Sequence, residues 1–172
     1  RRLLRETPII DGHNDYPWEV RQRAQGDITK LDLRVPQPVI MTDLPPLKAG
    51  GVGGQFWSGY VPSPPPGTHP PVSVTQALEQ IDIVQRMVAR YPDGLALALT
   101  ADDVERAIKQ GRIASLIGME GGHSINSSLA ALRMMHRLGA RYMTLTHSLN
   151  TPWADSATDT AKLDGLSPFG EQ

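Results

Sequence analysis

Two residues near the start of the chain, His13 and Asp15, have the types and the spacing of a metal-binding pair. An imidazole nitrogen and a carboxylate oxygen both suit Zn²⁺, at about 2.0–2.2 Å. The pair follows residues 8–10, an apolar segment that predicts a buried strand. Because side chains alternate between the faces of a strand, residues two apart should point the same way and could hold one ion. For an isolated His-x-Asp, a turn at Asp11-Gly12 is the more common explanation.

Glu120 strengthens the metal hypothesis. It directly follows residues 113–119, an almost continuous apolar run that predicts a buried strand. A carboxylate at such a place is costly to desolvate unless it is paired or binds a metal. Its two oxygens could bridge two ions about 3.5–4 Å apart, as two-metal hydrolases require. The alternative is a salt bridge to Arg112 or Arg141. Three nearby glycines are expected to leave room for a metal or a ligand: Gly118, Gly121 and Gly122.

A second candidate for chemistry is His147, which ends the apolar segment 142–146. That segment predicts another strand, so His147 is expected at the same edge of the sheet. It could be a metal ligand, a general base or a donor to a substrate carbonyl. His123 lies beside the predicted glutamate site and is assigned a supporting role, while His69 and His136 are expected to be non-catalytic.

The segments between these strands are typical of amphipathic helices. Ser73 with Gln76 has the pattern of a capping box, and apolar residues recur behind it at three- and four-residue spacing to about Tyr91. Thr100 with Asp103 repeats the capping signal before a shorter helix that should end near Gly111. A third helix is expected from residue 129 to 138, with Gly139 as its left-handed cap. The segment between residues 62 and 71 is too rich in proline for regular structure.

Apolar strands that alternate with helices predict an α/β fold with a parallel sheet covered on both faces. A further strand is expected within residues 51–60. Polar groups at the carboxyl ends of such strands are typical of a (β/α)8 TIM barrel, which usually needs about 250 residues. Only about half of its units are visible, and Ser167-Pro168 followed by Glu171 resembles a helix start. Residues 1–172 are therefore expected to be the N-terminal part of a single barrel domain.

Composition excludes several classes of function. The formal net charge of −1 gives no reason to expect nucleic acid or an anionic membrane as a partner. The chain has no cysteine, so disulfides, thiol catalysis and cysteine zinc sites are excluded, and any metal must be held by His, Asp or Glu. No apolar run approaches the roughly 20 residues of a transmembrane segment. The compartment stays open: a soluble protein in the cytoplasm, in the periplasm or secreted.

Four segments, in order, resemble the signature blocks of the membrane (renal) dipeptidase family. They are Asp11-Gly12-His13-Asn14-Asp15, Gly54-Gln55-Phe56-Trp57-Ser58, Gly118-Met119-Glu120-Gly121-Gly122-His123-Ser124 and Leu145-Thr146-His147-Ser148-Leu149-Asn150-Thr151-Pro152-Trp153-Ala154-Asp155. The resemblance covers nearly the whole chain, and four linked blocks are far more specific than any one of them.

This resemblance implies a (β/α)8 barrel of the metal-dependent hydrolase type with two zinc ions that hydrolyses dipeptides. By the same resemblance, His13 and Asp15 bind one zinc, Glu120 bridges both as a catalytic residue, and His147 is catalytic and contacts the substrate. The two histidines of the second zinc lie further along the family's chains, as do an Arg and an Asp that hold the substrate. Residues 1–172 alone are therefore expected to be inactive. Because it has no cysteine, the chain is more similar to the soluble bacterial-type members of the family. A homodimer is a possible form of the protein.

Two alternatives remain at this point. The first is another metal-dependent barrel amidohydrolase, a class that commonly presents His-x-His on the first strand, where this chain has Asp15 in the second place. The second is a catalytically inactive binding member of the same family, since residues outside this chain could be altered.

Overall fold

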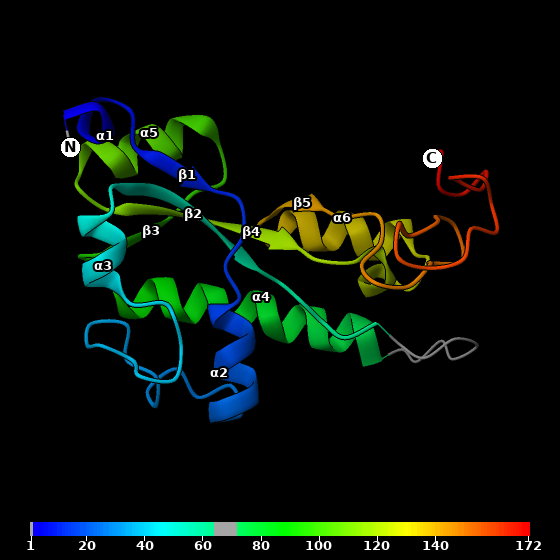
Figure 1. Cartoon of the computed structure of the whole chain (residues 1–172), viewed down its shortest axis with the longest axis horizontal. Coiled ribbons are helices and arrows are strands. Elements are labelled where there is room, and N and C mark those ends of the chain that lie inside the picture. The colour runs from blue at the N-terminus through cyan, green and yellow to red at the C-terminus, as the bar shows by residue number, and fades with distance from the viewer. Residues whose placement is uncertain (1, 64–71) are drawn as a thin grey trace.

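A five-stranded parallel sheet forms the centre of the computed structural model, which describes residues 2–63 and 72–172 (Figure 1). Its strands are β1 (Ile9–Asp11), β2 (Val52–Ser58), β3 (Leu95–Leu97), β4 (Ile113–Met119) and β5 (Ala140–Met143). The order is β1-β2-β4-β3, and β5 pairs with the later part of β4. Because every pair is parallel, the carboxyl ends of the strands lie at one edge of the sheet.

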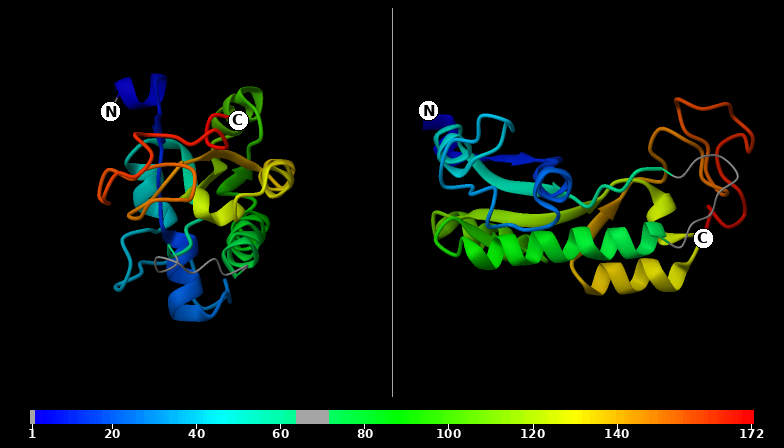
Figure 2. Two further views of the ribbon diagram at one scale, coloured as in Figure 1. Left: turned by 90° about the vertical axis from the view of Figure 1, so that its right-hand side faces the viewer. Right: turned by 90° about the horizontal axis from the view of Figure 1, so that it is seen from below.

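The part of the chain that the structure describes has six α-helices and one 3₁₀ helix around the sheet. They are α1 (Arg2–Glu6), α2 (Tyr16–Ala24), α3 (Leu44–Ala49), α4 (Val72–Arg90), α5 (Ala101–Lys109), the 3₁₀ helix Gly122–Ile125 and α6 (Leu129–Arg137). The long helix α4 runs along one side of the sheet and α5 lies on the other (Figures 1 and 2). Of the helices within residues 2–63 and 72–172, none is long and apolar enough to cross a membrane.

The central strand β4 is buried on both faces, as its apolar run predicts. Ile113 and Ile117 pack into a core that includes Met87 of α4. On the opposite face, Leu116 packs with Ala107 of α5. This two-sided burial explains why the strand is apolar without alternation, and it confirms the predicted sheet with helices on both faces.

Capping signals set the ends of the shorter helices. The Thr100 hydroxyl accepts a hydrogen bond from the Asp103 amide (3.2 Å), and the Asp103 carboxylate accepts one from the Thr100 amide (3.0 Å). The predicted capping box is therefore confirmed, and α5 ends two residues before Gly111, which has a φ of +71°. Beyond α6, Gly139 has a φ of +118°, which a side chain would disfavour.

Several sequence-based expectations differ from the structure. The last strand ends at Met143 rather than at residue 146. The Thr144 amide still donates a hydrogen bond to the Met119 carbonyl, and the chain then leaves the sheet. The β1 strand is not buried: Ile9 and Ile10 are half exposed, since β1 is an edge strand that pairs only with β2 among the described residues.

Helix boundaries differ as well. Helix α4 begins at Val72, so Ser73 lies inside the helix and is not its cap. Ser167 caps a single turn. Its Oγ accepts a hydrogen bond from the Gly170 amide (3.4 Å), and its carbonyl accepts one from the Glu171 amide (3.1 Å). Strand β3 and helices α1 to α3 were not predicted. Most of the proline-rich segment and His69 lie outside the described residues.

Candidate metal centre

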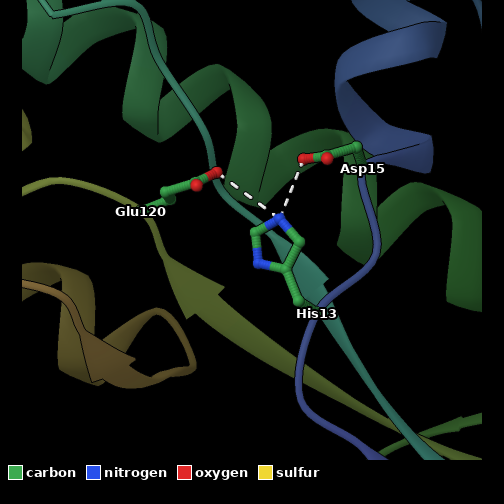
Figure 3. A group of neighbouring side chains, drawn as sticks. All are labelled: His13, Asp15 and Glu120. Carbon is green, nitrogen blue, oxygen red and sulfur yellow. Dashed lines mark hydrogen bonds and ion pairs between the residues drawn. The ribbon is translucent and has the colours of Figure 1, made fainter. Parts of the chain in front are cut away.

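Three predicted ligands meet at the carboxyl edge of the sheet (Figure 3). His13 Nε2 lies 3.2 Å from Asp15 Oδ1 and 3.5 Å from Glu120 Oε2. One ligand atom from each of the three residues lies within 4.8 Å of the other two. It is the one such group in the part of the chain that the structure describes. The predicted convergence of these side chains is therefore what the structure shows.

His13 and Asp15 reach this place in a way that strand alternation does not explain. Strand β1 ends at Asp11, so both residues lie beyond it. Asp15 is the residue before α2 and makes no side-chain capping bond with that helix; its carboxylate faces His13 instead. Asn14 fixes the turn between them: its Oδ1 accepts from the Tyr16 amide (3.0 Å) and its carbonyl from the Ser58 amide (2.9 Å).

Glu120 arrives from β4 and is the most enclosed of the three, with 19% of its side chain exposed. Its register beside β2 places Ser58 Oγ 3.2 Å from Glu120 Oε2. The alternative salt bridges do not form: Arg112 donates to the Pro92 carbonyl (3.4 Å) and Arg141 to the Leu99 carbonyl (2.6 Å).

His147 lies on the other side of the same carboxylate. Its Nε2 is 3.3 Å from Glu120 Oε1, while Ser148 Oγ contacts its Nδ1 at 2.9 Å. It is four residues past the end of β5, so a loop positions it and not a strand. Within that loop, Ser156 Oγ donates to the His147 carbonyl (2.6 Å). The carboxylate of Asp155 accepts from the amides of Lys162 (3.0 Å) and Leu163 (2.9 Å), which closes the loop.

The donor set fits a zinc ion. Ligand atoms at about 2.0–2.1 Å from a tetrahedral Zn²⁺ lie roughly 3.3 Å from one another. The distances from His13 Nε2 to Asp15 Oδ1 (3.2 Å) and to Glu120 Oε2 (3.5 Å) are close to this ligand-to-ligand distance. One imidazole and two carboxylates are also a ligand set that zinc accepts. The second oxygen of Glu120 faces His147, so one carboxylate is presented to both sides.

The glycines of this region do not leave empty space for a ligand, contrary to expectation. A Cβ on Gly118 would lie 2.1 Å from the Tyr142 ring, and one on Gly121 would lie 2.2 Å from the His123 ring. A Cβ on Gly122 would lie 2.5 Å from the Trp153 ring. These glycines admit protein side chains that pack against the strand ends.

Two tyrosines line the centre and were not predicted from the sequence. The Tyr60 ring packs edge-on against His147, with centroids 5.2 Å apart, and burial together with the nearby Glu120 and Asp15 raises its pKa. The Tyr142 hydroxyl donates to the Gly12 carbonyl (2.9 Å). Tyr60 lies two residues beyond the block that ends at residue 58, and this position is the one sequence signal that could have indicated it.

Two further histidines that the structure describes, His123 and His136, do not belong to the candidate ligand group. His123 Nε2 contacts the Val61 carbonyl at 2.9 Å, and burial lowers the pKa of its ring, which suits a neutral histidine that supports the loop after β2. His136 is exposed on α6. The positions of both agree with the sequence interpretation.

Comparison with known sequences identifies relatives along the whole chain. The sequence profile of membrane dipeptidases (peptidase family M19) matches residues 1–172. Dipeptidase ataJ of Aspergillus terreus is 45% identical over 177 residues, which cover 100% of this chain and 43% of the relative. Dipeptidase 3 of Mus musculus is 43% identical over 99% of this chain and 34% of its own length. The chain thus spans less than half the length of these curated relatives.

Solved structures give the same fold. A metallopeptidase from Rhodobacter sphaeroides, liganded with a phosphinate mimic of the dipeptide L-Ala-D-Ala, has a TM-score of 0.73 at 25% identity, covering 95% of this chain and 53% of its own. The metallopeptidase dipeptidase AC has a TM-score of 0.74 at 28% identity, covering 95% and 51%. The probable dipeptidase PvdM of Pseudomonas aeruginosa shares the fold, with a TM-score of 0.78 at 22% identity, covering 99% and 44%. The predicted fold class, part of a (β/α)8 barrel, is confirmed, whereas a bacterial-type origin stays a prediction.

Proposed function

The chain belongs to the membrane dipeptidase family, peptidase family M19, and from this premise we propose that the whole protein is a zinc-dependent dipeptidase. His13 and Asp15 would bind one zinc ion, and Glu120 would bridge it to a second. The observation that carries the proposal is the meeting of three donor atoms within 4.8 Å of one another. They come from the turn between β1 and α2, which holds His13 and Asp15, and from Glu120, the residue after β4. Exposed acidic groups often cluster without a metal, but here an imidazole lies between two carboxylates at distances that suit zinc.

The relatives support a dipeptide as the substrate. The Rhodobacter sphaeroides structure carries a phosphinate mimic of a dipeptide, and a tetrahedral phosphinate resembles a peptide carbonyl under attack by water. The fungal and mouse relatives are named dipeptidases. Two zinc ions, when bound, would make hydroxide available near neutral pH and polarise the scissile carbonyl.

The protein's own residues have separate tasks in this proposal. Ser58 Oγ donates to Glu120 Oε2 and holds the carboxylate in orientation. His147 presents Nε2 toward the centre and would donate a hydrogen bond to the oxyanion that develops at the carbonyl. The Tyr60 ring packs against His147 and limits the rotation of its imidazole.

We also infer how the whole protein is organised. Residues 1–172 would form the N-terminal part of one barrel domain, and the second zinc's remaining ligands would come from outside these residues. A homodimer and a soluble form in the cytoplasm, in the periplasm or secreted remain predictions.

The test is hydrolysis by the whole purified protein of a dipeptide, of the same dipeptide with an acetylated amino terminus, and of a cyclic amide. We expect turnover of the free dipeptide only, its loss with a chelator, and its recovery with Zn²⁺. Preference for the cyclic amide would instead indicate an amidohydrolase. Zinc bound without any turnover would indicate an inactive binding member, and in either case the proposal fails.

A further inference from the structure

Tyr142 of β5 reaches across the carboxyl edge of the sheet toward β1. Its hydroxyl donates to the Gly12 carbonyl at 2.9 Å, although the two residues are 130 positions apart in the sequence. On the way its ring lies over Gly118 of β4 and packs against Phe56 of β2, with centroids 5.1 Å apart. One side chain therefore connects the ends of four neighbouring strands.

This crossing depends on the absence of a side chain at Gly118. A Cβ there would lie 2.1 Å from Tyr142 Cζ and 2.4 Å from its hydroxyl oxygen, so the ring could not keep its place. The phenol keeps its proton near neutral pH, because the ordinary pKa of a tyrosine is about 10, so it can donate this hydrogen bond.

The accepting carbonyl is next to a proposed metal ligand. The Gly12 carbonyl belongs to the planar peptide unit that ends at the His13 Cα, so a hydrogen bond to that oxygen fixes the plane from which the imidazole extends. A Cβ on Gly12 would have no atom within 4 Å, so the surrounding structure has room for a larger residue at this position. As a glycine, residue 12 has a backbone that rotates more freely than that of other residues, and a hydrogen bond is needed to fix it. On the other side of His13, the Asn14 carbonyl accepts from the Ser58 amide (2.9 Å).

We propose that Tyr142 is a positioning residue for the metal centre: through the Gly12 carbonyl it holds the turn that aims His13 at Asp15 and Glu120. The turn is then fixed on both sides of His13, by Tyr142 before it and by Ser58 after it. This role rests on the proposed metal-binding function. Tyr142 would act through the backbone, by its hydrogen bond to the Gly12 carbonyl.

Tyr142→Phe tests the proposal, because it removes the hydroxyl and keeps the ring over Gly118. The matched control is Tyr91→Phe, since the Tyr91 hydroxyl also bonds to a backbone group, the Leu33 amide (3.2 Å), away from the centre. In the whole, metal-free protein, nitrogen-15 relaxation should show greater mobility of the His13 amide in Tyr142→Phe alone. The dissociation constant for Co²⁺, followed by its visible spectrum, should rise on the order of tenfold in that variant and stay unchanged in the control.

Gly118→Ala gives an independent second test. It should displace the Tyr142 ring and weaken Co²⁺ binding as Tyr142→Phe does, and combining the two changes should cost little more than either alone, because both break the same link. Unchanged His13 mobility in Tyr142→Phe, or greater mobility without weaker Co²⁺ binding, would overturn the positioning role. If the wild-type protein binds Co²⁺ no better than His13→Ala, the proposed metal site itself fails, and the mobility measurement still decides whether Tyr142 holds the turn.

Discussion

Glu120 connects the two halves of the candidate centre at the scale of single residues. One of its oxygens faces His13 and Ser58, and the other faces His147. A carboxylate that offers one oxygen to each side is the geometry that bridging between two cations requires. The partners of Glu120 are thus two histidines and a hydroxyl, and not the arginines that a structural salt bridge would use.

The first prediction concerns Glu120→Gln. The amide keeps the size of the side chain but loses the charge that two cations need, so turnover of a dipeptide by the whole protein should fall about 100-fold or more. Zinc content, measured by atomic emission, should fall as well. Glu105→Gln on the exposed face of α5 is the control and should change neither. A Glu120→Gln variant with near-wild-type rates would remove the bridging role.

The second prediction separates His147 from the metal ligands. If its task is to stabilise the oxyanion, His147→Ala should lower kcat by about 100- to 1000-fold and leave the bound zinc unchanged. His136→Ala, at an exposed position of α6, should behave like the wild type. Loss of zinc from the His147 variant would instead make His147 a ligand.

At the scale of elements, the loop after β5 determines where His147 lies. Asp155 holds this loop by accepting the amides of Lys162, Leu163 and Gly165, and the Ser156 hydroxyl then reaches the His147 carbonyl. The backbone bonds from Lys162 and Leu163 lower the pKa of the Asp155 carboxyl. His147 is thereby brought to the edge of the sheet, beside Glu120, without belonging to a strand.

The third prediction is the pH dependence of this loop. Because the pKa of Asp155 is lowered in the folded protein, its stabilising effect is present above the ordinary carboxyl pKa of about 3.9 and is lost as the pH falls through the folded value. In a pH titration by NMR, the amide signals of Lys162 and Leu163 should shift with a midpoint below 3.9. Asp155→Asn should show those amides already changed at neutral pH. A midpoint at or above 3.9 would contradict the assigned bonds.

At the scale of the whole molecule, metal binding and folding should be linked. An ion that binds only the native state adds about 2.7 kcal/mol at a free concentration 100 times its dissociation constant. The fourth prediction is therefore that Zn²⁺ raises the Tm of the whole protein by several degrees in calorimetry. His13→Ala should lose most of this rise. An equal rise in that variant would place the stabilising zinc elsewhere.

Local signals in the sequence determined much of the fold. The Thr100–Asp103 capping box, the apolar spacing of α4 and the almost continuous apolar run of β4 each depend on neighbours a few residues apart, and the structure has each of them. The donor types were also readable: Glu120 directly follows an apolar segment, and His13 and Asp15 lie within five residues of the end of another.

Tertiary structure alone decided how these residues meet. The β2–β4 register places Ser58 beside Glu120, the turn before α2 aims His13 and Asp15, and the Gly118 position receives Tyr142. Strand β1 pairs only with β2 among the described residues and is half exposed there, although its sequence is as apolar as that of a buried strand. Such contacts join residues tens of positions apart, and they depend on strand register and on packing across the sheet. No pattern of near neighbours contains that information, and this is why the candidate ligands could be named from the sequence while the residues around them could not.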